Sequence, residues 1–159
     1  MKKYITNNFE ETQKLGEDFA RTLDSRLRGN DNRKGAIIIG LTGNLGGGKT
    51  TFLQGFAKGL GIKDKILSPT FVIMKKFSLP VIPAKAGIQI SKNFYHFDCY
   101  RINKPEEILE LDFKNIIKNQ ENIIAIEWPE KIKKVLSKEI IEIDFKFIDE
   151  NKREINFKT

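Results

Sequence analysis

Eight consecutive residues near position 45 have the composition of a loop that binds phosphate groups. They match the Walker A pattern G-x-x-x-x-G-K-[ST] at every fixed position and read Gly43-Asn44-Leu45-Gly46-Gly47-Gly48-Lys49-Thr50. Glycines let such a loop wrap closely around phosphates, because no Cβ keeps the backbone N–H groups away. In this pattern the lysine reaches the β- and γ-phosphates, and the hydroxyl binds Mg²⁺. The motif predicts a site for ATP and Mg²⁺, with Lys49 and Thr50 in those roles.

Two acidic residues follow predicted strands and are candidates to complete a magnesium site. Asp98 follows the segment Phe94–Phe97, and Glu127 follows Ile123–Ile126. Magnesium prefers oxygen ligands, and ligands of open α/β sheets bind at the carboxyl ends of the strands. The pattern does not choose between the two acids. His96 is the only histidine and alternates with apolar residues, which favours a packed or surface imidazole over a catalytic base.

The segments around the Walker A motif predict a strand, a turn and a helix in that order. Residues 36–41 are apolar and rich in isoleucine, which is typical of a strand buried on both faces. Four apolar residues then recur at helical spacing until Gly61 ends the pattern. These four are Leu53, Phe56, Ala57 and Leu60. This order would place the amino end of a helix against the phosphates.

Further elements alternate along the chain. Residues 9–23 predict an amphipathic helix, and residues 71–75, 94–97 and 123–126 predict strands. A helix is expected to open at Pro105, because proline suits a first helical turn. Such alternation favours an α/β sheet with a parallel core.

The end of the chain and two polar segments have a different pattern. Apolar and charged residues alternate over 141–147, and a turn at 149–151 precedes a second short strand, so we predict an antiparallel hairpin. Residues 24–35 and 78–92 are predicted to be surface loops. The expected fold is a single α/β domain over 1–159, of the three-layer P-loop NTPase type, with a mostly parallel central sheet and an antiparallel C-terminal hairpin.

Composition narrows the classes of protein that fit. Hydrophobic residues make up 40% of the chain, enough for one core, and the net charge of +7 suits a phosphate-rich or acidic partner, although a solvated lysine-rich surface explains it equally well. The single cysteine rules out an intrachain disulfide and a cysteine zinc cluster. No leader-like or membrane-spanning apolar run is present. We therefore expect a cytoplasmic protein without a membrane partner.

Four motifs together resemble the TsaE family, formerly YjeE, whose members are P-loop ATPases needed for threonylcarbamoyladenosine in bacterial tRNA. The resemblance extends from Glu11-Thr12 to the final hairpin. The four matching stretches are Gly43 to Phe52, Ser68-Pro69-Thr70-Phe71, Tyr95-His96-Phe97-Asp98-Cys99-Tyr100-Arg101 and Ile126-Glu127-Trp128-Pro129. The same order of four motifs is far more specific than one phosphate-binding loop.

The resemblance implies roles for residues whose function their pattern alone does not decide. Asp98 would join Thr50 around Mg²⁺, and Glu127 would act on the attacking water, so that Lys49 and Glu127 would be the catalytic residues. Ser68 to Thr70 would form a switch-like loop near the γ-phosphate, although a simple turn explains this segment equally well. The nucleotide would contact Thr12, Asn44, Leu45, Gly46, Gly47, Gly48, Lys49, Thr50, Thr51 and Trp128, with Thr12 near the adenine.

The resemblance also implies partners, and this chain departs from the family in two respects. The TsaD and TsaB proteins would be the partners, with tRNA reached through their complex and ATP turnover resetting that complex. The family usually has an aspartate where this chain has Asn44, which removes one charge beside the phosphates. Residues 24–35 and 78–92 contain what look like translated genomic repeats, which we expect to be exposed and mobile, without a catalytic role.

Two other functions fit parts of the sequence. A small P-loop kinase would share the phosphate-binding loop, but no arginine-rich lid or acceptor-binding pair of acid and arginine is apparent. A nucleotide-dependent regulator that does not hydrolyse ATP, or a basic RNA-binding module, would use the loop only to stabilise a conformation. Replacement of Glu127 separates an ATPase from such a regulator.

Overall fold

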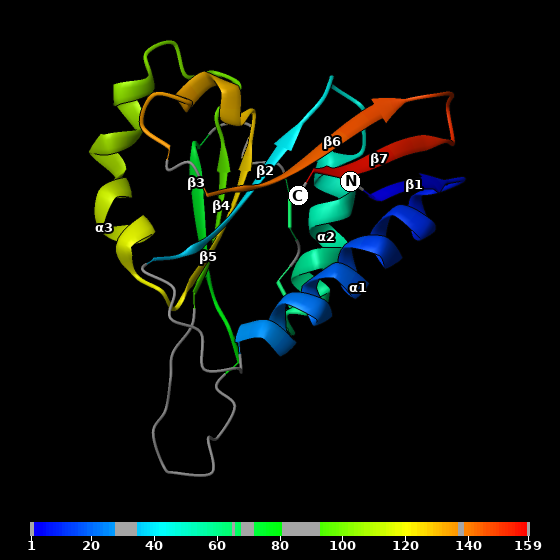
Figure 1. Ribbon diagram of the computed structural model, residues 1–159, viewed down its shortest axis with the longest axis horizontal. Helices are drawn as coiled ribbons and strands as arrows, with labels where there is room; N and C mark the ends of the chain where they lie inside the picture. Colours follow the sequence, from blue (N-terminus) through cyan, green and yellow to red (C-terminus); the bar gives the residue numbers. More distant parts are fainter. Residues whose placement is uncertain are drawn as a thin grey trace.

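A central β-sheet organises the part of the chain that the structure describes (Figure 1). The computed structural model describes residues 2–27, 35–64, 66–67, 72–80, 93–136 and 139–158, without the side chains of 24–27. The sheet has the order β1-β7-β6-β2-β5-β4-β3. Its strands are β1 (Lys2–Thr6), β2 (Ile37–Thr42), β3 (Met74–Ser78), β4 (Asn93–Asp98), β5 (Asn122–Glu127), β6 (Ile141–Phe147) and β7 (Arg153–Lys158). The helices are α1 (Phe9–Leu27), α2 (Lys49–Gly59), α3 (Phe113–Lys118) and the 3₁₀ helices η1 (Pro105–Leu111) and η2 (Pro129–Ile132).

The middle of the sheet is buried on both faces, which gives three layers. On β5, Ile123 and Ala125 pack into a core with residues of α1 and α2, whereas Ile124 and Ile126 pack with residues of α3, η1 and η2. Figure 1 shows α3 across the sheet from α1 and α2. Strands covered on both faces carry continuous apolar runs, as these do. The predicted α/β fold with helices on both faces is confirmed.

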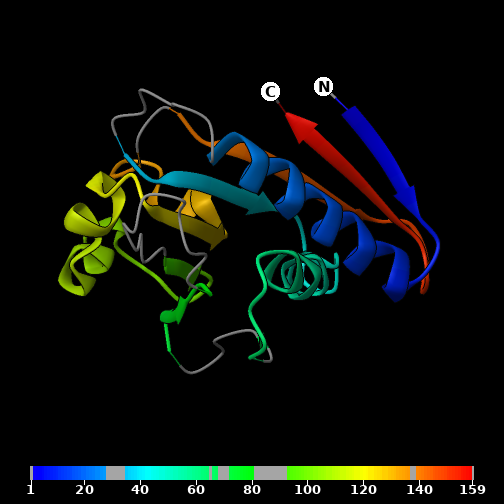
Figure 2. The same ribbon diagram turned by 90° about the horizontal axis from the view of Figure 1, so that it is seen from below.

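The strand directions also agree with the prediction. Strands β6, β2, β5 and β4 are mutually parallel, whereas β3 runs antiparallel to β4. Strands β6 and β7 form the predicted antiparallel hairpin. Strand β1 pairs with β7 and was not predicted, because its residues 2–5 are all exposed and show no buried face. Figure 2 shows the two chain ends side by side as a result.

A close approach between α1 and α2 brings their amino-terminal turns to the same region. A Cβ added at Gly55 of α2 would lie 1.8 Å from the carbonyl oxygen of Gln13 on α1, so only glycine permits this packing. Helix α1 begins at Phe9 as expected, and Asn8 Oδ1 caps it by accepting the backbone N–H of Glu11 at 2.7 Å.

Two sequence-based boundaries are wrong. Helix α1 continues through residues 24–27, which were predicted to be loop, while 28–34 lie outside the described residues. Strand β3 covers 74–78 rather than 71–75, and residues 81–92 of the second predicted loop are not described. A helix does open at Pro105 as predicted. It is a 3₁₀ helix, and α3 follows it after Asp112, whose φ is 58°.

Candidate nucleotide-binding site

The predicted phosphate-binding loop connects β2 to the first residue of α2. Gly43 has φ 120°, and a Cβ there would lie 2.1 Å from the carbonyl oxygen of Phe145, so the loop lies directly against β6. Gly48 precedes α2 in a left-handed conformation with no side-chain cap, and the first helical N–H bonded to its carbonyl is that of Phe52. The N–H groups of Gly48 to Thr51 therefore have no partner within the helix and can bind an anion.

The side chain of Lys49 lies within this loop. It is 4% exposed, and Nζ donates to the carbonyl oxygens of Gly43 at 2.6 Å and Asn44 at 2.9 Å. Nζ also lies 4.5 Å from the centre of the Trp128 ring, a cation–π distance. Burial lowers the pKa of the Lys49 ammonium, and the carboxylate of Glu127 acts in the opposite direction. The loop carbonyls and the indole ring thus hold a cation beside the free helical N–H groups.

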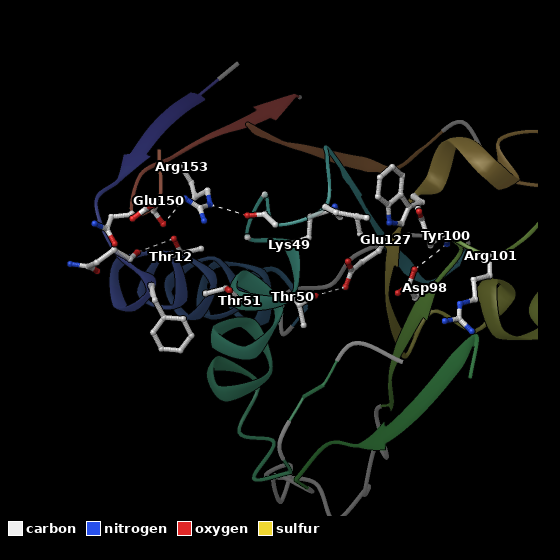
Figure 3. Close-up of a pocket in the computed structure, with 18 of the residues that line it drawn as sticks. Thr12, Lys49, Thr50, Thr51, Asp98, Tyr100, Arg101, Glu127, Glu150 and Arg153 are labelled. Atoms are coloured by element: carbon white, nitrogen blue, oxygen red, sulfur yellow. Dashed lines mark hydrogen bonds between the residues drawn. The ribbon is translucent and has the colours of Figure 1, made fainter. Parts of the chain in front are cut away.

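The two candidate acids are neighbours at the carboxyl ends of parallel strands. Asp98 is paired in register with Glu127 across β4 and β5. Thr50 Oγ1 donates to Glu127 Oε1 at 3.1 Å, and the Asp98 carboxylate accepts the backbone N–H of Tyr100 at 3.0 Å (Figure 3). Thr50, whose hydroxyl is predicted to bind the metal, therefore contacts Glu127, which by the family resemblance would act on the attacking water.

At this position the described residues offer hard oxygen donors for a magnesium ion but no cage of protein ligands. Among the described residues, no three His, Cys, Asp or Glu side chains are grouped as a metal site. Magnesium commonly takes one or two protein oxygens and completes its shell with water and phosphate oxygens. The hydroxyl of Thr50 with the carboxylate of Asp98 or Glu127 fits that requirement.

One cavity of about 660 Å³ joins these residues, a volume within the usual range for small-molecule sites (Figure 3). Its walls contain most of the predicted nucleotide and metal residues. These are Thr12, Leu45, Gly46, Gly47, Gly48, Lys49, Thr50, Thr51, Asp98, Glu127 and Trp128. Asn44 is not among them and contributes only its carbonyl to Lys49. Ser68 and Thr70 lie outside the described residues.

The far end of the cavity comes from residues that the sequence did not indicate. Asn8 and Phe9 at the start of α1 line it, together with Glu150, Asn151 and Arg153 of the β6–β7 hairpin. Figure 3 places the labelled Thr12, Glu150 and Arg153 on the side of the loop away from Asp98. The turn at 149–151 was recognised, but its position beside the loop was not.

Arg153 fixes the hairpin against the phosphate-binding loop. Its Nε donates to the carbonyl oxygen of Gly46 at 3.1 Å, although the two residues are 107 positions apart. Its Nη1 donates to the carbonyl oxygen of Asp149 at 2.6 Å, and its guanidinium lies 4.7 Å from the centre of the Phe147 ring. Local sequence patterns do not predict contacts between residues so far apart in the sequence.

Trp128 and His96 lie next to Glu127 in two different ways. Trp128 has φ 60°, and its ring centre lies 5.1 Å from that of Tyr100. His96 is fully buried, which confirms a packed imidazole, and its Nε2 lies 3.0 Å from Glu127 Oε1. The sequence did not predict this contact.

In the part of the chain that the structure describes, no helix combines the length and apolar character needed to cross a membrane.

Comparison with known proteins identifies the family. A model of the family described as "Threonylcarbamoyl adenosine biosynthesis protein TsaE" matches residues 6–155. The chain is 39% identical to the tRNA threonylcarbamoyladenosine biosynthesis protein TsaE of Rickettsia felis, over 94% of this chain and 75% of that protein. Identity to the Bacillus subtilis TsaE is 35%, over 98% and 84%. The crystal structure of Bacillus subtilis YdiB, which has a P-loop fold, superposes with a TM-score of 0.66 at 29% identity, over 98% and 83%. Because the family model spans most of the sequence and agrees with the phosphate-binding loop, this chain belongs to the TsaE family.

Proposed function

We propose that this protein is a magnesium-dependent ATPase that supports threonylcarbamoyladenosine modification of tRNA. The observation that carries the proposal is the gathering of a phosphate-binding loop, Lys49, Thr50 and two carboxylates in one cavity. Family membership supports the pathway, and the cavity supports the chemistry.

The triphosphate is proposed to lie at the amino end of α2. The free N–H groups of the loop and the helix dipole favour negative charge there. Lys49, already held by two loop carbonyls, supplies a fixed positive charge within reach of the terminal phosphates. The base is proposed to occupy the far end of the cavity, between Thr12 of α1 and Arg153 of the hairpin.

Magnesium is proposed to be held by Thr50 and Asp98, and when bound it would neutralise charge that develops on the phosphate oxygens. Glu127 is proposed to hold and polarise the attacking water. Glu127 is 4% exposed and lines the cavity, and its Oε1 lies within hydrogen-bond distance of Thr50 and His96. The other oxygen accepts no hydrogen bond from the described residues, so it is the oxygen that can accept one from water.

The substitution of Asn44 for the usual aspartate is proposed to have little effect on this chemistry. Its side chain does not line the cavity, and its backbone carbonyl keeps the contact to Lys49. The segment 68–70 remains a proposed switch-like loop.

The partners are proposed to be TsaD and TsaB, with tRNA reached through their complex in the cytoplasm. The family description supports a place in this pathway. The test is phosphate release from ATP by the purified chain, measured alone and then with TsaB, TsaD and tRNA. Stimulation is expected with the complete set, and no release under either condition would refute the ATPase.

The same assay separates the alternatives. A kinase requires an acceptor and releases little free phosphate in its absence. A regulator that does not hydrolyse ATP binds it with wild-type affinity in the Glu127→Gln variant and shows no release in either protein.

A further inference from the structure

His96 lies beneath the candidate site on the same face of the sheet as Glu127. His96 of β4 pairs with Ala125 of β5. Glu127 lies two residues after Ala125 on β5, so its side chain is on the same face as that of His96. The ring is fully buried, with Nε2 3.0 Å from Glu127 Oε1. A buried side chain in the middle of a strand has little freedom to move, so the position of the His96 ring is fixed.

The hydrogen bond defines which ring nitrogen carries a hydrogen. An ionised carboxylate only accepts hydrogen bonds, so Nε2 of His96 must be the donor to Glu127. Nδ1 is buried and has no hydrogen-bond partner among the described residues. A hydrogen on Nδ1 would be an unpaired buried donor, which is costly. The ring therefore carries its hydrogen on Nε2.

Two donors meet at one carboxylate oxygen. Glu127 Oε1 accepts from His96 and from the hydroxyl of Thr50 at 3.1 Å. In the proposed function Thr50 turns to the metal when the nucleotide binds, so that one of these two contacts is given up. The contact from His96 does not depend on the nucleotide, because the ring lies behind the carboxylate and does not line the cavity.

We propose that His96 is a positioning residue whose Nε2–H holds Oε1 of Glu127 and leaves the second oxygen aimed at the attacking water. The inference rests on the proposed ATPase function. Orientation of a water-binding group affects the chemical step, whereas the nucleotide is held by other residues. Loss of the contact therefore lowers kcat and leaves nucleotide affinity nearly unchanged.

The test compares two substitutions of His96 with a control on the same strand. His96→Phe fills the space without a donor, and His96→Gln supplies an amide N–H in place of Nε2–H. Phe94→Leu alters the same face of β4 two residues away, where no contact to Glu127 exists. ATP turnover with the complete partner set gives kcat and KM, and the fluorescence of Trp128, the only tryptophan, gives nucleotide affinity.

We expect kcat to fall about tenfold or more in His96→Phe, with KM and nucleotide affinity within about twofold of wild type. His96→Gln should recover most of that loss, and Phe94→Leu should keep wild-type kcat despite lower thermal stability. Wild-type kcat in His96→Phe overturns the positioning role. So does an equal loss in His96→Gln, or a loss that appears in KM instead of kcat.

A second measurement does not depend on activity. His96 is the only histidine, so its ring nitrogens give unambiguous ¹⁵N signals in NMR spectra. The hydrogen is expected on Nε2, slow to exchange with water, with a shift that changes in Glu127→Gln. A hydrogen on Nδ1, or no response to Glu127→Gln, refutes the contact.

A wild type that releases no phosphate with all partners refutes the ATPase and this role together, whereas an active wild type beside an unimpaired His96→Phe refutes the role alone.

Discussion

The two ends of the cavity are built in different ways. At the phosphate end, residues 43–51 supply the loop, the lysine, the hydroxyl and the helix terminus from one continuous segment. At the far end, the start of α1 and the hairpin turn line the same cavity, although more than one hundred positions separate them in the sequence. The first end depends on local backbone geometry, and the second depends on the order of strands in the sheet. Substitutions at the two ends should therefore affect different steps.

Lys49→Ala is expected to have the largest effect. It removes a buried cation held against the loop carbonyls, and turnover should fall by about a hundredfold or more while the far end stays intact. Phosphate release measures turnover, and circular dichroism checks the fold. Lys63→Ala, beyond the end of α2, is the matched control and should turn over ATP as wild type does. Full turnover in Lys49→Ala would remove the basis for the proposed site.

Glu127→Gln should stop hydrolysis without weakening binding. The amide keeps the size of the side chain but loses the charge that polarises water, so kcat should fall by about a hundredfold. Trp128 fluorescence should show ATP affinity within a few-fold of wild type. Glu130→Gln changes a nearby acid that does not line the cavity and should retain most activity. Normal phosphate release by Glu127→Gln would show that another group acts on the water.

Asp98→Asn should shift the magnesium requirement rather than abolish activity. A neutral amide binds Mg²⁺ more weakly than a carboxylate, and half-maximal turnover should need about tenfold more Mg²⁺. Titration of activity with MgCl₂ at saturating ATP measures this shift. Asp64→Asn, outside the cavity, serves as the control. An identical titration curve for Asp98→Asn would leave Glu127 as the metal-binding acid.

Arg153→Ala tests the far end. The change removes the contact between the hairpin and Gly46, so ATP affinity should fall by about three- to tenfold, with kcat at saturation little changed. Arg153→Lys should behave in the same way, because an ammonium cannot reproduce the several directed contacts of a guanidinium. Nucleotide titration by Trp128 fluorescence gives the affinity. A loss confined to kcat would show that the hairpin acts on the chemical step.

The smallest effect is expected where β1 joins β7. Hydrogen bonds from Lys3, which contributes most, and from Asn156 and Lys146 lower the pKa of Glu154 to about 2. A carboxyl group whose pKa is lowered by folding stabilises the folded state at pH values above its pKa in the unfolded chain. This stabilisation is lost as the pH falls from about 4 to 2. Glu154→Gln should lower the Tm at pH 7 by about 2 °C or less and flatten its decline over that range. If the Tm of Glu154→Gln declines with falling pH as much as that of the wild type, groups other than Glu154 cause the acid sensitivity.

The phosphate end was predictable because its chemistry lies in consecutive residues. Strand, loop, lysine and helix all appear where the motif placed them. The pairing of Asp98 with Glu127 was also within reach, since parallel strands bring their carboxyl ends to one edge. The boundaries of α1 and β3 were wrong: α1 continues to Leu27, and pairing with β4 sets β3 at Met74–Ser78.

By itself the sequence determined the phosphate-binding loop, the alternation of buried strands and helices, and the C-terminal hairpin, because each depends on neighbouring residues. Only the tertiary structure decided that Arg153 contacts Gly46, that β1 completes the sheet, and that His96 lies within hydrogen-bond distance of Glu127. These contacts follow from strand order and register. A shift of one residue in pairing would turn each side chain to the other face of the sheet, and no local pattern reports that choice.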